Sequence, residues 1–122
     1  MTNTEIAQSF LKTIMAGEIE EAFEKYISAD FKHHNAYTPA GSEALKAGMK
    51  QSGSQFPQKI FEIKHLTSEG NIVMTHSLIK FNQDHPGVAV VHIFRIENGK
   101  IAELWDVGQL VPTDGLNQDG MF

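Results

Sequence analysis

Two patterns of apolar residues divide the chain near Pro57. Before this residue, apolar side chains recur every three or four positions, as they do along one face of a helix. This spacing predicts three helices: one from the capping box Thr2–Glu5 to Gly17, one from Glu18 to Ile27, and one from Ser42 to near Gly53. The first two are joined so closely that they form an αα-hairpin, and their apolar stripes must share one partner surface.

Beyond Pro57, residues rich in Ile, Val, Phe and His alternate with polar ones, which is the period of half-buried strands. Four strands are predicted between clusters of turn residues: Lys59–Glu69, Asn71–Asn82, Val88–Glu97 and Lys100–Leu110. The strongest turn signal is Asn98-Gly99, because a type I′ hairpin needs a positive φ at two successive residues. Such short connections predict an antiparallel meander.

Two segments fit neither pattern. Phe31–Tyr37 is rich in aromatic residues and histidine and has no helical stripe, so we predict a short strand or an extended segment there. Residues 111–122 contain Pro112 and two glycines, which indicates an irregular tail. Because this tail ends in Met121-Phe122, we expect it to dock on the domain formed by residues 1–110 or on a partner subunit.

Helices followed by a meander are typical of the α+β class. Long strands coil strongly, so we expect a conical barrel in which three N-terminal helices pack on a curved antiparallel sheet and enclose one pocket. The strand Val88–Glu97 is largely apolar on both faces, which indicates that both faces are covered. Helices can cover the concave face, and we expect a second copy of the chain to cover the convex one, making a homodimer.

Composition excludes several classes of function. The 122 residues suit one domain, and 41% hydrophobic with 20% charged residues is ordinary globular usage. A net charge of −5 without any densely basic window predicts neither nucleic-acid binding nor a polybasic membrane contact. There is no cysteine, so disulfides and thiol catalysis are excluded. No signal-like start and no apolar stretch of spanning length is found, so we expect a cytoplasmic protein.

The chemistry most open to catalysis is that of the histidines. His76 and His92 lie in the middle of adjacent predicted strands among apolar neighbours, so they can share one wall. With His34 from the Phe31–Tyr37 segment, they would form a polar pocket floor that titrates near neutrality. The alternative is that they are core histidines whose ring nitrogens are satisfied within the protein. Asp106 would orient one of them or act as a base.

Other residues would contact a ligand. We expect Asn35 and Gln109 to hydrogen-bond it, Trp105 to form a wall, and Phe94 and Met74 to line the pocket. Neighbours on a strand point to opposite faces, so Trp105 and Asp106 cannot both face inward unless a bulge intervenes, for which Gly108 is the candidate position. The four candidate catalytic residues suit zinc by type, but they lack any local spacing motif, so no metal site is predicted.

Nearly the whole chain resembles the NTF2-like superfamily, and within it the SnoaL-like group of predicted aldol-condensation or ester cyclases. The resemblance is carried by His34-Asn35, by the stretch Val90–Val107 and by the tail segment Asn117–Phe122. It implies a conical α+β barrel, a dimer through the convex sheet face, and no cofactor. The acid/base aspartate that such cyclases carry four residues beyond the tryptophan is Gln109 here, and the nearest carboxylate is Asp106.

Three functions remain open at this point. The first is a cofactor-independent lyase, isomerase or cyclase that uses His and Asp acid–base chemistry on a small apolar carbonyl compound. The second is a small hydrophobic-ligand binding protein without catalysis. The third is a dimeric interaction module whose pocket is filled by the Met121-Phe122 end of the tail.

Overall fold

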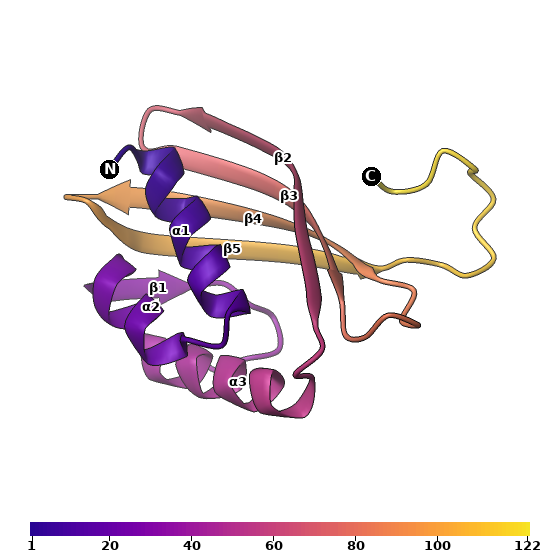
Figure 1. Cartoon of the computed structure of the whole chain (residues 1–122). Helices are drawn as coiled ribbons and strands as arrows, with labels where there is room; N and C mark the ends of the chain where they lie inside the picture. Colours follow the sequence, from indigo (N-terminus) through magenta and orange to yellow (C-terminus); the bar gives the residue numbers. More distant parts are fainter.

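The computed structural model describes all 122 residues. It is a five-stranded curved sheet with three helices on one face (Figure 1). This confirms the predicted α+β class. The elements are α1 (Asn3–Met15), α2 (Ile19–Tyr26), β1 (Ile27–His33), α3 (Ser42–Gln55), β2 (Ile60–Glu69), β3 (Ile72–Lys80), β4 (Val88–Glu97) and β5 (Lys100–Leu110). No helix is long and apolar enough to cross a membrane.

The sheet has the strand order β1-β5-β4-β3-β2. Strands β2 to β5 form the predicted antiparallel meander, whereas β1 pairs in parallel with β5, so the sheet is mixed rather than wholly antiparallel. Strand β1 also begins earlier than the predicted segment Phe31–Tyr37. It follows α2 with no intervening loop, because Ile27 is both the last residue at helical spacing and the first of the strand.

Local sequence signals account for the ends of two elements. The Thr2 hydroxyl accepts a hydrogen bond from Glu5 N at 3.1 Å, and Thr2 N donates to Glu5 Oε1 at 3.1 Å, which completes the predicted capping box of α1. Asn98 and Gly99 have φ values of 52° and 76°, as a type I′ turn between β4 and β5 requires.

The core lies between the helices and the sheet face turned toward them, which we call the inner face. Phe10 of α1 is fully buried there and meets Phe23 of α2 and Phe94 of β4, with ring centroids 5.8 and 6.3 Å away. One row across the inner face matters for function. In it Thr75, His92 and Asp106 are Cα partners on β3, β4 and β5.

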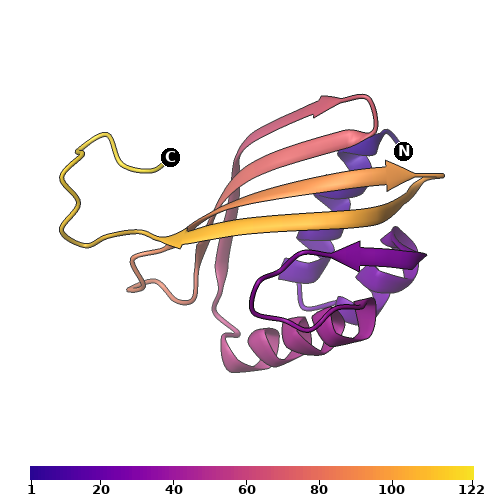
Figure 2. The ribbon, with the colours of Figure 1, turned by 180° about the vertical axis from the view of Figure 1, so that it is seen from behind.

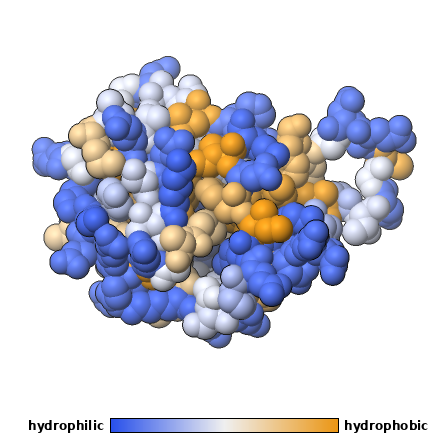
Figure 3. Space-filling model, in the orientation of Figure 1, coloured by the Kyte–Doolittle hydropathy of each residue, from blue (hydrophilic) through white to orange (hydrophobic).

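The opposite sheet face, which we call the outer face, has no helix over it (Figure 2). The tail leaves the end of β5 and bends back, and the Phe122 ring stacks on His76 at 5.5 Å. Seen from the helix side, hydrophobic residues gather beside α1, over β2 and β3, while polar residues cover the helices (Figure 3).

Candidate functional site

A cavity of about 540 Å³ lies between the helices and the inner face of the sheet. Apolar side chains of α1 and α3, including Met15, Leu45 and Met49, form part of its wall. Its polar lining comes mainly from loops and strands: Asn35, Thr38, Ser52, Lys59, His92 and Asp106. The volume and the mixture of apolar walls with a few polar groups are those of a small-molecule site.

His92 occupies the middle of β4 on the inner face and is only 8% exposed. Its Nδ1 atom is buried without a hydrogen-bond partner. Nε2 makes no hydrogen bond either but keeps some exposure, so it is the ring nitrogen that a ligand can reach. Burial lowers the pKa of His92 to about 4, against the opposing pull of the Asp106 charge. The imidazole is therefore neutral near pH 7.

Asp106 lies beside His92 across β4 and β5, and Asn35 holds its carboxylate from the loop after β1. The Asn35 amide nitrogen donates to Asp106 Oδ1 at 3.1 Å and to Oδ2 at 3.0 Å. The orientation of this amide is fixed at its other end, where Asn35 Oδ1 accepts a hydrogen bond from Tyr37 N at 2.9 Å. Asp106 and Asn35 thus lie together in the cavity wall as a partly buried polar pair, which the sequence predicted only as separate residues.

A second histidine, which sequence reasoning did not select, supports this loop. His33 is buried, and its Nε2–H donates to Pro39 O at 2.8 Å while its Nδ1 accepts from Asn35 N at 3.2 Å. These bonds fix the tautomer of His33 and anchor Asn35 under Asp106. His33 is thus a structural histidine with both ring nitrogens satisfied.

Two buried hydroxyl groups lie on the inner face close to His92, although neither residue lines the cavity. Thr75 and Ser77 point inward from β3, and neither Oγ1 of Thr75 nor Oγ of Ser77 has a hydrogen-bond partner. Buried polar groups without partners are uncommon and costly, so this part of the inner face is polar beyond the needs of the fold. The sequence signal for it was the alternation of β3, which placed these small polar residues on the face opposite His76.

Lys59 is a further polar residue of the cavity that sequence reasoning missed. Its Nζ donates to Ser52 Oγ at 2.5 Å and lies 5.9 Å from the ring centroid of Phe81. Phe81 in turn stacks on Phe56 at 4.6 Å, so aromatic rings flank the ammonium group. Burial lowers the pKa of Lys59 below its usual value.

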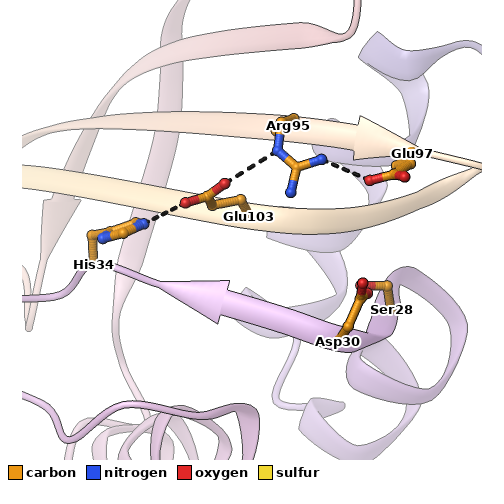
Figure 4. A network of polar contacts seen from close by, with 6 residues as sticks. All are labelled: Ser28, Asp30, His34, Arg95, Glu97 and Glu103. Atoms are coloured by element: carbon orange, nitrogen blue, oxygen red, sulfur yellow. Dashed lines mark hydrogen bonds and ion pairs between the residues drawn. The ribbon is translucent and has the colours of Figure 1, made fainter.

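His34 does not enter the cavity, contrary to the prediction. It stacks on Trp105 at 4.9 Å, and its Nε2–H donates to Glu103 Oε2 at 2.6 Å. Figure 4 shows this pair continuing through Arg95 to Glu97 across the outer face. The reason is the pairing of β1 with β5, which turns His33 inward and therefore directs the next residue outward.

His76 also lies on the outer face, where it stacks on His65 with the two Nδ1 atoms 3.0 Å apart. In the register of β3 and β4, His92 faces Thr75 and His76 faces Val91. An offset of one residue places the two histidines on opposite sides of the sheet. The predicted convergence of His34, His76 and His92 is therefore wrong.

Four predicted ligand contacts also lie outside the cavity. Trp105, Gln109 and Met74 point to the outer face, because the register of β4 and β5 shifts only between Arg95 and Ile96 and not near Gly108. Asp106 thus faces inward and Trp105 outward. Phe94 does point inward, but it is fully buried in the core against Phe10 and does not reach the cavity.

A more open hollow of about 660 Å³ lies between α2 and α3 and is lined almost wholly by polar surface residues and glycine. One of its glutamates, Glu20, pairs with Lys50 of the lining and with Lys46. No three His, Asp or Glu side chains anywhere in the chain come together as metal ligands would. We therefore assign the candidate site to the cavity around His92, Asp106 and Asn35, called here the His92–Asp106 site.

Comparison with known proteins agrees with this architecture. The model of the SnoaL-like domain family matches residues 7–104. The chain belongs to the SnoaL-like family. None of the proteins of curated function matches it.

Solved structures of this NTF2-like, cystatin-like fold superpose well at low identity. One is an uncharacterised cystatin-fold protein from Novosphingobium aromaticivorans, with 20% identity and a TM-score of 0.74 over 88% of this chain and 98% of that one. Another, from Bacillus cereus and provisionally named a polyketide cyclase, has 22% identity and a TM-score of 0.75 over 88% of this chain and 74% of that one. At such identities the likeness establishes the fold alone.

Proposed function

We propose that the His92–Asp106 site binds a small, mostly apolar carbonyl compound and moves a proton next to the carbonyl group without a cofactor, as a lyase, isomerase or cyclase does. The observation that carries this proposal is the Asp106 carboxylate. The side-chain amide nitrogen of Asn35 donates to both of its oxygens, and the carboxylate lies beside a buried neutral imidazole in a cavity with apolar walls. The provisional name of the Bacillus cereus structure is compatible with such chemistry.

In this mechanism Asp106 is the base. Its carboxylate accepts a proton from the carbon next to the ligand carbonyl, while Asn35 keeps the carboxylate in position. His92 is neutral, so it does not serve as the acid–base group expected from its ordinary pKa. Instead, Nε2–H donates a hydrogen bond to the carbonyl oxygen and stabilises the negative charge that develops on it. Asp106 then returns the proton, or a leaving group departs.

The first test is deuterium exchange. Bicyclic aryl ketones such as 2-tetralone carry acidic protons next to the carbonyl, and in D₂O their loss is followed by proton NMR. The wild-type protein should accelerate this exchange, and Asp106→Asn should slow it by at least about 100-fold because the base is lost. Glu103→Gln is the matched control, since Glu103 is a carboxylate of the same strand on the outer face.

Equal exchange by wild type and Asp106→Asn would overturn the assignment of the base. Binding of the ketones without any accelerated exchange would favour the second function, a small hydrophobic-ligand binding protein. That alternative draws on the same apolar walls, with the polar groups of the cavity binding the ligand without reaction.

We also propose that the protein forms a homodimer through the outer face. Met74, Val91 and Val107 expose apolar side chains there, and Val107 is 68% exposed. Within one chain, Phe122 lies on His76 at this face rather than in the cavity, so its own tail does not fill the site. A second copy on the outer face would cover these residues and leave the mouth of the cavity to the ligand.

A further inference from the structure

Lys59 is a cation of the cavity wall that has no acidic partner. It precedes β2, donates to the Ser52 hydroxyl, and forms no ion pair. Four other lysines do pair with glutamate: Lys25, Lys46, Lys50 and Lys64. The charge of Lys59 is thus left uncompensated where the chain partly removes it from water.

Such a placement has a cost that a ligand can offset. Burying an ammonium group is unfavourable unless it is paired and hydrogen-bonded, and Ser52 supplies only one neutral acceptor. The direction of the Lys59 pKa shift reports the same cost. The flanking Phe56 and Phe81 rings keep this end of the cavity apolar. An anionic group here would meet a partly buried cation, and the hydrogen bond would be charge-assisted.

The two ends of the cavity also differ in charge. Asp106 is its one carboxylate, and His92 beside it is neutral, so an anion is repelled from that end. Lys59 lies at the other end, next to Ile60, whose partner on β3 is Lys80. Lys80 lies five positions beyond Thr75, the partner of His92, which is roughly 17 Å along the strand. An apolar ligand body fits between these two polar ends.

We infer that the ligand of this cavity is an apolar compound with an acidic group at one end, which Lys59 binds, and with its carbonyl group at His92 and Asp106. The inference rests on the proposed use of the cavity as the ligand site, but not on catalysis. A carboxylate, sulfonate or phosphate shares the chemistry that Lys59 recognises. Lys59 in this account selects the ligand and sets its orientation.

Two fluorescent probes test this directly because they share one aromatic skeleton and differ by an acidic group. They are 1-anilinonaphthalene-8-sulfonate, which is anionic, and N-phenyl-1-naphthylamine, which is neutral. Wild type should bind the anionic probe more tightly. In Lys59→Met, the affinity for the anionic probe should fall roughly tenfold or more, as loss of a charge-assisted hydrogen bond does, while the affinity for the neutral probe should change less than about twofold.

The control variants separate charge from folding. Lys59→Arg keeps the charge and should retain the preference for the anionic probe. Lys80→Met removes a neighbouring lysine that points away from the cavity and should leave both affinities unchanged. Thermal unfolding of each variant checks that it is folded.

The outcomes distinguish this inference from the proposed function. If Lys59→Met binds both probes with the wild-type ratio of affinities, the role of Lys59 is wrong and the cavity remains a ligand site. If the neutral probe binds wild type but does not shift the His92 ring signals in NMR, the cavity is not the binding site, and the proposed function fails together with the inference.

Discussion

At the scale of single residues, the strand face decides what each histidine can do. His92 points inward, is buried and is kept neutral by burial, whereas His34 and His76 point outward and stack on Trp105 and Phe122. In the sequence, His76 and His92 looked alike as mid-strand imidazoles among apolar neighbours, and His34 lay in a segment rich in aromatic residues and histidine. The chemistry proposed for the cavity therefore depends on one buried imidazole with one carboxylate and not on a cluster of histidines.

The burial of His92 predicts how stability depends on pH. Its pKa is about 4 in the folded chain and near 6.5 when unfolded, so between these values the unfolded chain binds a proton that the folded chain does not. The free energy of unfolding should fall by up to about 3 kcal/mol as the pH falls from 7 to 4. In His92→Gln this part of the decrease should be absent, which urea unfolding at several pH values measures.

His65→Gln is the matched control, because His65 is exposed on the outer face and bonds no carboxylate. This variant should follow the pH dependence of the wild type. If His92→Gln loses stability toward pH 4 as steeply as wild type does, His92 is not the buried neutral group described here.

At the scale of elements, the sequence pattern located the strands well but not how they meet. The four strands of the meander lie within two residues of their predicted ends, because alternation and turn residues are local signals. Register between strands is not local. Two pairings decide which residues face the cavity: Thr75, rather than His76, pairs with His92, and β1 pairs with β5. An offset of one residue would turn the opposite set of side chains toward the cavity.

Because strand register is not a local signal, the sequence predicted some residues of the candidate site and missed others. His92 and Asp106 share the inner face because the register of β4 and β5 shifts by one residue between the pairs Ile96–Ile101 and Arg95–Glu103. The turn at Asn98-Gly99 alone would place Trp105 opposite His92. Asn35 was found by its residue type in a segment rich in histidine. Lys59 was missed because nothing near it in the sequence shows that Ser52 and Phe81 lie beside it.

The tail gives a prediction at this scale. Deletion of residues 112–122 keeps the hydrogen bond from Val111 N to Gly87 O, which is 2.9 Å long, and removes only the segment that lies on the outer face. Because Phe122 contacts His76 and not the cavity, the affinity for N-phenyl-1-naphthylamine should change less than about twofold. A marked rise in affinity on deletion would instead mean that the tail occupies the cavity.

At the scale of the whole molecule, one sheet presents two different surfaces. The inner face carries the core and the His92–Asp106 site under the helices, and the outer face is left without a covering element (Figure 2). Successive side chains of a strand point to opposite faces of the sheet. Substitutions on the outer face can therefore test assembly without touching the cavity.

The proposed homodimer is tested by Val107→Glu. This substitution puts a carboxylate among the exposed apolar side chains of the outer face, so it should raise the dimer dissociation constant by at least about tenfold, measured by sedimentation equilibrium. Gln51→Glu, at an exposed position of α3 on the helix side of the sheet, is the control for added negative charge. Wild type that sediments as a monomer at all concentrations would contradict the dimer.

The most direct measurement for the whole account is an NMR titration of the histidine ring signals and the Asn35 side-chain amide with N-phenyl-1-naphthylamine. The His92–Asp106 site predicts that the signals of His92 and Asn35 shift as the probe binds, while those of His34 and His76 stay in place. Shifts at His34 or His76, with His92 and Asn35 unmoved, would place binding on the outer face and contradict the account.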